Sequence, residues 1–376
     1  MTTKPARRRT SKSAASKDRT AVEPLSPEVQ AVTPTPRRAY STGDAQLDAA
    51  IAALAAAAGS ADPDLLAELI TTSVRLARGG GNRGELKLAS ASLREFARAF
   101  KLFARYRDKR KVSIFGSART EMGDLAYRIT AAFARAVVQR GWMVITGAGP
   151  GIMAAGNEGA GAAASFGANI HLPGYEQTNI FIANNAKLIT FRYFFTRKVT
   201  FVKESDAFVL LPGGFGTLDE TFELLTLMQT GKSAPRPVVL LEPPGSTYWA
   251  EWQEFIHDHL TLRGFIEAED TAFFRVATSV EEAVDEIERF YANYHSMRFV
   301  GPTLYLRLRA APDEAALARL RRDFADLLVE GTYEVAPPAP VEVEEGDTLD
   351  YARLAFRPVH NYARLRLLID ALNELE

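Results

Sequence analysis

The sequence predicts an α/β fold: a Rossmann-like, doubly wound parallel sheet, with an N-terminal helical extension and a small C-terminal α+β module. Between Lys111 and about residue 295, short runs of β-branched and apolar residues alternate with helical patterns. Several of these runs are continuously apolar, which is typical of parallel strands covered by helices on both faces. Glycine-rich segments follow three of the runs, where such sheets bind ligands.

The composition is that of a globular protein and excludes several kinds of site. Of the 376 residues, 47% are hydrophobic and 24% charged, which is enough to build a sizeable core. With 45 basic and 46 acidic residues, the net charge of −1 does not favour nucleic acid or a membrane surface as a partner. The chain has no cysteine, which excludes disulfides, thiolate zinc sites and a cysteine nucleophile. We therefore expect a cytoplasmic protein.

The first 108 residues divide into two parts. Residues 1–40 combine Lys, Arg, Ser, Thr and Pro with few large apolar residues, so we expect a disordered tail. Their Arg-rich start also resembles a transit peptide. Residues 41–108 form the helical extension, in which we expect the third helix to pack against the following domain. The predicted helices cover about residues 44–58, 63–77 and 84–108. The apolar stretch at 49–58 is too short for the roughly 20 residues of a membrane span.

Residues 109–298 are predicted to form the Rossmann-like domain. The predicted strands are 111–115, 142–146, 167–171, 187–191, 207–211 and 237–241. The predicted helices cover about 121–140, 151–164, 193–204, 217–230, 246–260 and 279–292.

Residues 299–376 are predicted to form the α+β module. We expect a strand at 303–309, a helix at 312–329, an acidic Pro-rich loop, a strand at 353–359 and a final helix. No catalytic pattern is present in this segment, so we interpret it as an interaction or dimerisation element.

Three glycine-rich loops follow predicted strands, and each leads into a helix: 116–120, 147–153 and 212–217. Glycine allows the backbone to turn sharply and approach a ligand, and the free amides at a helix start favour an anion. The dinucleotide fingerprint is not matched, because Ile152 stands at the third glycine position after the second strand, and no P-loop pattern occurs. A single phosphate fits these loops better.

The third loop permits a second interpretation. Thr217 precedes Glu220 by three residues, which is the spacing of a capping box that only stabilises the start of a helix. Gly213, Gly214 and Gly216 are more glycine than a cap requires. The loop can therefore serve a ligand, a helix cap or both.

The segment "PGGFGTLDE" at 212–220 resembles the PGGxGTxxE motif of the LONELY GUY (LOG) family. These are cytokinin riboside 5′-monophosphate phosphoribohydrolases formerly labelled lysine decarboxylases. Three other segments agree with the resemblance, which covers roughly residues 105–295: "FGSAR", "TGAGPGIMAAGNEGA" and "FFTRKVTF". Extensions at both ends set the chain apart from the compact plant-type members.

The resemblance implies the site residues. Arg197 and Glu220 match the family's catalytic pair, 220 − 197 = 23 residues apart and on either side of one predicted strand. The residues implied for the substrate phosphate are Gly213, Gly214, Gly216 and Thr217. Further candidates for the nucleotide pocket are Gly116, Ser117, Arg119, Gly149, Gly151, Met153, Asn157, Glu158 and Lys198. Without the resemblance, Arg197 and Lys198 would be read as a solvated basic helix face.

The resemblance also implies an activity. A LOG-type enzyme hydrolyses the N-glycosidic bond of a nucleoside 5′-monophosphate, a cytokinin riboside monophosphate or an AMP-like nucleotide, to free base and ribose 5-phosphate. A carboxylate stabilises the positive charge that develops on the sugar. The resemblance implies no metal or organic cofactor, no nucleic-acid or membrane partner, and a homodimer or higher homo-oligomer. The alternative function is a non-catalytic nucleotide-binding or sensor module, since the same fold can bind without catalysis.

Overall fold

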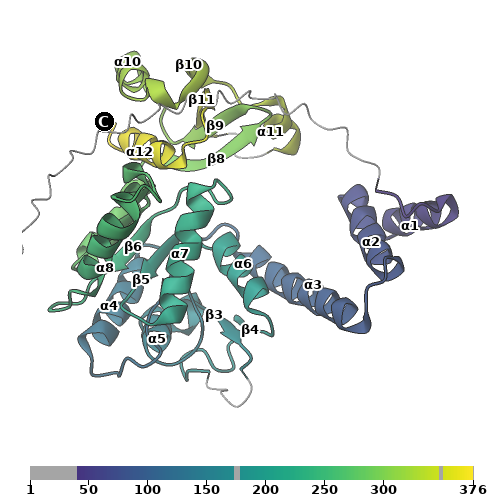
Figure 1. Cartoon of the computed structure of the whole chain (residues 1–376), viewed down its shortest axis with the longest axis horizontal. Helices are drawn as coiled ribbons and strands as arrows, with labels where there is room; N and C mark the ends of the chain where they lie inside the picture. Colours follow the sequence, from purple (N-terminus) through teal and green to yellow (C-terminus); the bar gives the residue numbers. More distant parts are fainter. Residues whose placement is uncertain (1–39, 173–177, 347–349, 376) are drawn as a thin grey trace, which may run out of the picture.

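A computed structural model describes residues 40–172, 178–346 and 350–375. Its largest element is a parallel sheet of seven strands in the order β4-β3-β2-β1-β5-β6-β7 (Figure 1). The strands are β1 (Lys111–Phe115), β2 (Met143–Thr146), β3 (Ser165–Ile170), β4 (Leu188–Phe191), β5 (Ala207–Leu210), β6 (Val238–Leu241) and β7 (Phe274–Ala277). The chain builds outward from β1 to β4 and then returns to add β5 beside β1. The direction of winding therefore reverses between β1 and β5.

Both faces of this sheet are buried, which explains why its strands are continuously apolar. In β1, Val112 and Ile114 belong to one hydrophobic core, whereas Phe115 belongs to the core on the opposite face. In β5, Val209 belongs to the same core as Val112, and Phe208 belongs to the same core as Phe115. The covering helices are α4 (Leu125–Gln139), α5 (Ile152–Ala164), α6 (Phe194–Glu204), α7 (Phe215–Gln229), α8 (Tyr248–Ile256) and α9 (Val280–Phe290). The predicted doubly wound, Rossmann-like sheet is confirmed.

Three helices precede the sheet: α1 (Ala45–Ala57), α2 (Pro63–Arg78) and α3 (Arg83–Phe103). The C-terminal end of helix α3 lies against the sheet domain, while α1 and α2 lie apart from this domain (Figure 1). The buried Glu95 carboxylate of α3 accepts hydrogen bonds from the Thr196 hydroxyl (2.5 Å) and the Arg192 amide (2.8 Å). The Phe103 ring stacks on Phe166 at 4.6 Å. The expected packing of the third helix against the sheet domain is confirmed.

The C-terminal part has more strands than the sequence predicted. Its antiparallel sheet has the order β10-β11-β9-β8 and consists of β8 (Tyr294–Val300), β9 (Thr303–Leu308), β10 (Leu328–Ala336) and β11 (Ala352–Pro358). Helices α10 (Glu314–Asp323), α11 (Pro340–Glu345) and α12 (Tyr362–Asn373) accompany it. The predicted boundary between residues 298 and 299 lies inside β8.

The predicted helix at 312–329 is wrong at its C-terminal end, because α10 stops at Asp323 and β10 begins at Leu328. Strand β10 is an edge strand in which only Tyr333 is buried, so it lacks the alternation that signals a strand. Part of the predicted acidic loop belongs to β10 and α11. Strands β7 and β8 were not predicted either.

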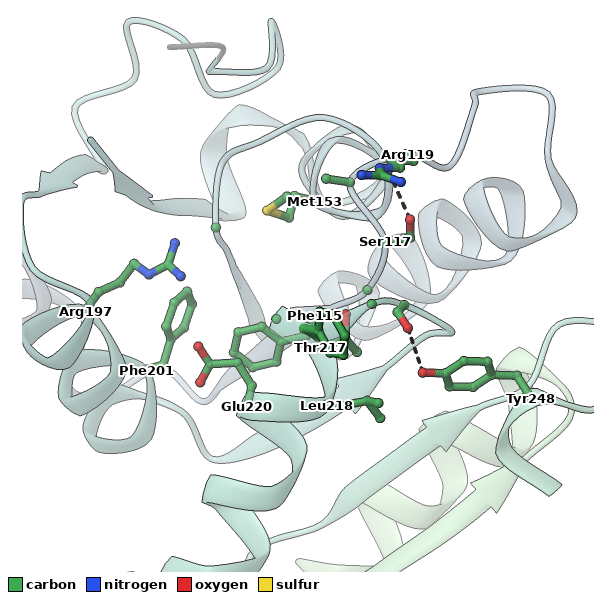
Figure 2. Close-up of a pocket in the computed structure, with 17 residues that line it drawn as sticks. Phe115, Ser117, Arg119, Met153, Arg197, Phe201, Thr217, Leu218, Glu220 and Tyr248 are labelled. Carbon is green, nitrogen blue, oxygen red and sulfur yellow. Dashed lines mark hydrogen bonds between the residues drawn. The ribbon is translucent and has the colours of Figure 1, made fainter. Parts of the chain in front are cut away.

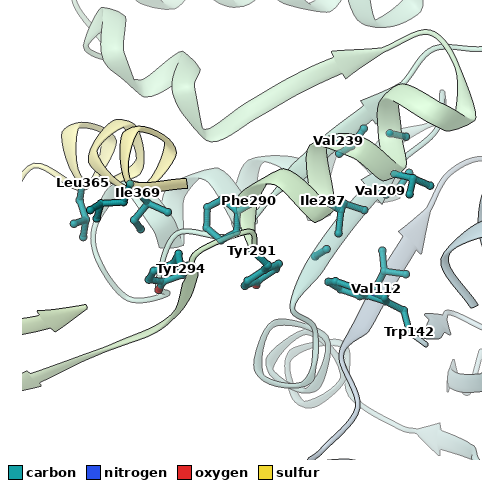
Figure 3. Close-up of a cluster of buried hydrophobic side chains, with 14 of the residues drawn as sticks. Val112, Trp142, Val209, Val239, Ile287, Phe290, Tyr291, Tyr294, Leu365 and Ile369 are labelled. Carbon is teal, nitrogen blue, oxygen red and sulfur yellow. The ribbon is translucent and has the colours of Figure 1, made fainter. Parts of the chain in front are cut away.

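The two sheets share one hydrophobic core. Phe290 and Tyr291 at the end of α9 and Tyr294 in β8 lie between residues of the parallel sheet, such as Val112, and Ile369 of α12 (Figure 3). The C-terminal part is therefore fastened to the parallel sheet by apolar packing.

Two further expectations concern the N-terminal tail and a membrane-spanning helix. The predicted disordered tail lies outside the described residues, apart from residue 40. Across residues 40–172, 178–346 and 350–375, no helix combines the length and apolar character that a membrane crossing requires.

Candidate active site

A cavity of about 810 Å³ opens at the carboxyl ends of β1 and β5, where the winding of the sheet reverses (Figure 2). Such reversal points are the usual ligand sites of open parallel sheets. The loop after β1, the loop after β2, helix α6 and the start of α7 all reach this cavity. Its lining consists of Phe115, Gly116, Ser117, Ala118, Arg119, Gly147, Met153, Arg197, Phe201, Gly213, Gly214, Phe215, Gly216, Thr217, Leu218, Glu220 and Tyr248.

The glycine turn, defined as residues 212–216, connects β5 to α7 and presents backbone amides. The amides of Thr217 and Leu218 donate to the Gly214 carbonyl at 3.0 and 3.1 Å. Within the described chain, the amides of Phe215 and Gly216 have no such acceptor. Free amides at a helix start and the positive end of the helix dipole favour an anion. The turn therefore offers donors for a phosphate.

The three glycines of this turn differ in how closely they are packed. A Cβ on Gly213 would lie 2.1 Å from Thr217 Oγ1, so no other residue fits there. A Cβ on Gly214 or Gly216 would meet no atom within 4 Å, so these two positions face open space. Thr217 itself is buried.

The capping-box interpretation of Thr217 and Glu220 is wrong. Helix α7 begins at Phe215 and its N-cap is Gly214, with no side-chain cap. The helix therefore starts two residues earlier than predicted, and Glu220 lies beyond its first turn. Without a role at the helix start, Glu220 is free to face the cavity.

Glu220 is a buried carboxylate, with only 6% of its surface exposed. It accepts no hydrogen bond from the described residues, and the cation nearest to it is Lys198, whose Nζ lies 3.9 Å from Oε2. Burial raises its pKa to about 7, although Lys198 and Arg197 act in the opposite direction. A carboxyl group that titrates near neutrality in a cavity is typical of catalytic acids and bases.

Arg197 extends from α6 into the cavity opposite Glu220 (Figure 2). Its guanidinium lies 5.0 Å from the centre of the Phe194 ring, and its buried Nε has no hydrogen-bond partner among the described residues. Burial lowers its pKa, against the pull of Glu220. No ion pair within 4.0 Å joins these two described side chains, and both of them line the cavity.

Lys198 does not line the cavity. Its ammonium pairs with Asp219 at 2.8 Å and with Glu223 at 2.9 Å. Only 15% of its side chain is exposed. The interpretation of Arg197 and Lys198 as a solvated basic helix face is therefore wrong.

The loop after β1 meets the glycine turn directly. Gly116, Ser117 and Arg119 all line the cavity, and the Ser117 amide donates to the Pro212 carbonyl at 3.1 Å. The Ser117 hydroxyl accepts from the Arg119 amide at 3.1 Å. The two loops thus form one continuous wall.

Of the candidates after β2, the structure brings only Met153 to the cavity. Gly149 and Gly151 do not line it; Gly151 has a φ of 65°, and a Cβ there would lie 2.3 Å from the Ser117 carbonyl oxygen. Gly151 therefore allows the two loops to pack together.

Asn157 and Glu158 were predicted for the nucleotide pocket, but they do not line the cavity, because their side chains make other contacts. The buried Asn157 amide oxygen accepts from the Thr146 hydroxyl and from Asn179, at 2.8 and 3.0 Å. The Glu158 carboxylate accepts from the Tyr127 hydroxyl at 2.7 Å. Both residues stabilise α5 rather than the cavity wall.

Sequence reasoning missed several cavity residues: Phe115, Ala118, Gly147, Phe201, Phe215, Leu218 and Tyr248. Tyr248 begins α8, which follows β6, and the carboxyl end of β6 lies beside that of β5, so its place after this strand was the available signal. The aromatic and aliphatic members give the cavity apolar walls between its polar groups.

No group of three or more His, Asp or Glu side chains in the described part of the chain is arranged to hold a metal ion.

Comparison with known proteins supports the resemblance found in the sequence. A family model described as "Possible lysine decarboxylase" matches residues 134–287. A probable cytokinin riboside 5′-monophosphate phosphoribohydrolase of Oryza sativa subsp. japonica is 37% identical over 99 residues, or 26% of this chain and 44% of that protein. A cytokinin riboside 5′-monophosphate phosphoribohydrolase of Arabidopsis thaliana is 36% identical over 101 residues, which is 27% of this chain and 46% of that protein. The resemblance to the LOG family is confirmed.

The chain spans less than half the length of these LOG relatives. Among solved structures, it is similar to a molybdenum cofactor binding protein from Rippkaea orientalis, with a TM-score of 0.36 and 20% identity over 48% of this chain and 96% of that one. A molybdenum cofactor carrier protein from Chlamydomonas reinhardtii has a TM-score of 0.34 and 20% identity over 48% and 97%. Scores this low support no functional conclusion.

Proposed function

We propose that the protein hydrolyses the N-glycosidic bond of a nucleoside 5′-monophosphate, releasing a free base and ribose 5-phosphate. One observation carries the proposal. The carboxylate of Glu220, buried and without a hydrogen bond from the described residues, faces the same cavity as the free amides of the glycine turn. The names of the LOG relatives support this reaction class.

In the proposed complex, the 5′-phosphate binds the amides of the glycine turn. The ribose then extends toward Glu220, so that the negative phosphate and the carboxylate contact different parts of one molecule. As the glycosidic bond breaks, positive charge develops on the sugar, and ionised Glu220 stabilises that charge or activates the attacking water. This division explains how an anion site and a carboxylate share one cavity.

Arg197 is assigned to the leaving base. Its guanidinium faces the cavity and makes no ion pair with Glu220, which supports a contact with substrate rather than orientation of the carboxylate. A permanently charged donor stabilises the electrons that the base retains when the bond breaks. Ser117 and Arg119 complete the wall on the side of the first loop.

Incubation with a panel of nucleotides tests the proposal. AMP, GMP, CMP, UMP and isopentenyladenosine monophosphate are each mixed with the purified protein, and free base and ribose 5-phosphate are quantified by chromatography. We expect release from at least one monophosphate and much slower release from the matching nucleoside, which lacks the phosphate. The ratio between AMP and its prenylated analogue assigns the preferred base. Binding of nucleotides without any release would instead support the non-catalytic module.

We also propose that the chain self-associates. Helix α6, which carries Arg197, exposes three large apolar side chains: Phe194, Phe195 and Val199 are 50%, 48% and 47% exposed. Apolar side chains gathered on one helix favour burial against a second copy. Light scattering coupled to size-exclusion chromatography tests this directly, and a monomer at micromolar concentration would contradict it.

A further inference from the structure

Tyr248 lies at the start of α8, in a position fixed by its neighbours. The following residue, Trp249, is fully buried, and its amide donates to the Glu242 carboxylate at the end of β6. The Tyr248 ring packs edge-on against the Trp249 ring, with 4.9 Å between the ring centres. The position of the Tyr248 hydroxyl is therefore set by the sheet rather than by a flexible loop.

That hydroxyl contacts the glycine turn. Tyr248 Oη donates a hydrogen bond of 2.7 Å to the carbonyl oxygen of Gly213 (Figure 2). The peptide between Gly213 and Gly214 is planar and trans, so its carbonyl and its N–H point in opposite directions. With the carbonyl fixed on Tyr248, the Gly214 N–H points away from α8.

This peptide has a particular need for a restraint. It joins two glycines, which adopt more backbone conformations than other residues. No neighbouring atom restrains Gly214 on the side where a side chain would stand, since a Cβ there would meet no atom within 4 Å. A flip of the peptide would replace the N–H by a carbonyl oxygen, which repels an anion. The Tyr248 hydrogen bond stabilises the orientation that suits an anion.

We propose that Tyr248 is a positioning residue of the phosphate site: its bond to Gly213 O holds the Gly214 amide toward the cavity as a donor for the substrate phosphate. This inference rests on the proposed function, because it assigns the glycine turn to the phosphate. Tyr248 acts through the backbone and does not take part in breaking the glycosidic bond.

A pair of tyrosine variants tests the inference. Tyr248→Phe keeps the ring and removes the hydroxyl, whereas Tyr127→Phe removes a hydroxyl with an equally short hydrogen bond, to Glu158, outside the cavity. Binding of ribose 5-phosphate and of adenine is measured by titration calorimetry, since neither compound can be hydrolysed further. We expect Tyr248→Phe to raise the Kd of ribose 5-phosphate by about fivefold, the usual effect of one hydrogen bond, without changing that of adenine. Tyr127→Phe should change neither Kd.

Three results would overturn the inference: an unchanged Kd of ribose 5-phosphate in Tyr248→Phe, an equal loss for adenine, or no binding of ribose 5-phosphate to the unmodified protein. The titration also separates this inference from the proposed function. If ribose 5-phosphate binds and Tyr248→Phe weakens it, but no nucleotide releases its base, the positioning role stands and the hydrolytic function does not.

Discussion

Glu220 in the parallel-sheet domain and Glu342 in the C-terminal part are both buried carboxylates, but their surroundings differ. Glu342 is fully buried and accepts from Arg307 Nε at 2.8 Å and from the Ala339 amide at 3.0 Å. The equally buried Arg353 lies 3.4 Å from it. Glu220 accepts no hydrogen bond from the described residues and has a single cation within 4.0 Å, Lys198.

The two surroundings have opposite consequences for protonation. Burial acts to raise the pKa of Glu342, but the Ala339 amide and Arg307 outweigh it and hold the pKa below its usual value. For Glu220, burial prevails over Lys198 and Arg197 and raises the pKa to about 7. A carboxylate whose partners lie within the protein stabilises the fold, whereas one left without them is available to a substrate. We therefore expect substitution of Glu220 to lower activity and substitution of Glu342 to lower stability.

The largest expected effect is on turnover. Glu220→Gln keeps the shape of the side chain but removes the negative charge, so the charge that develops on the sugar loses its stabilising partner. We expect kcat for the best nucleotide to fall by about 10³-fold, within the range of acid–base and electrostatic catalysis. Quantified base release measures this. Glu342→Gln is the matched control and should retain kcat; equal losses in both variants would remove the distinction.

The next effect is on stability. Glu342→Gln removes the carboxylate that pairs with the buried Arg307 and Arg353, and breaking a buried ion pair costs roughly 3 to 5 kcal/mol. Urea unfolding should show a loss of this size, whereas Glu220→Gln should not destabilise the protein at pH 8. A Glu342→Gln variant as stable as the unmodified protein would show that the cluster is dispensable.

The pH dependence of stability should have opposite signs at the two residues. Because the folded pKa of Glu220 is raised from 4.5 to about 7, the folded state holds its proton more tightly, and this stabilisation is present below pH 4.5 and lost as the pH rises to about 7. The loss is on the order of 3 kcal/mol. The contribution of Glu342 is present above its unfolded pKa and is lost as the pH falls through its lowered folded pKa.

Unfolding free energies of the unmodified protein and both Gln variants, measured from about pH 3 to 8, test these signs. The stability of the unmodified protein relative to Glu220→Gln should decline with rising pH. Relative to Glu342→Gln, it should decline with falling pH. Parallel curves for the unmodified protein and Glu220→Gln would mean that Glu220 titrates normally.

The smallest expected effect concerns Lys198. Its ammonium lowers the pKa of Glu220, so Lys198→Met should move the acid limb of kcat/KM upward by about one pH unit from its position near 7. Lys198→Arg keeps the charge and should leave the limb close to its original position. If Lys198→Met leaves the limb unmoved, Lys198 does not control the ionisation of Glu220.

The sequence predicted those features that depend on repeated local patterns. Continuous apolar runs predicted the strands of the parallel sheet, because both of its faces are buried. The doubly wound topology then brings Arg197 and Glu220 to one edge of the sheet, although their positions differ by 23 in the sequence. Arg197, Glu220 and all four residues of the proposed phosphate site line the cavity.

Other features depend on tertiary contacts that no local pattern reveals. Asn157 looked like a pocket residue, but only the packed structure shows its bonds to Thr146 and Asn179. Tyr248 belongs to none of the segments that carried the resemblance, since its role arises from a contact 248 − 213 = 35 residues away. Strand β10 was not predicted, because it forms by pairing with β11 and has no apolar face that the sequence pattern could reveal.

A crystal structure of Glu220→Gln with a bound nucleoside monophosphate tests the central claim most directly, because the variant should bind without turnover. The account predicts the phosphate within hydrogen-bond distance of the amides of residues 214–216, with the sugar carbon that carries the base facing residue 220. The reverse orientation, with the phosphate on Arg197 and the base against the glycine turn, would contradict it.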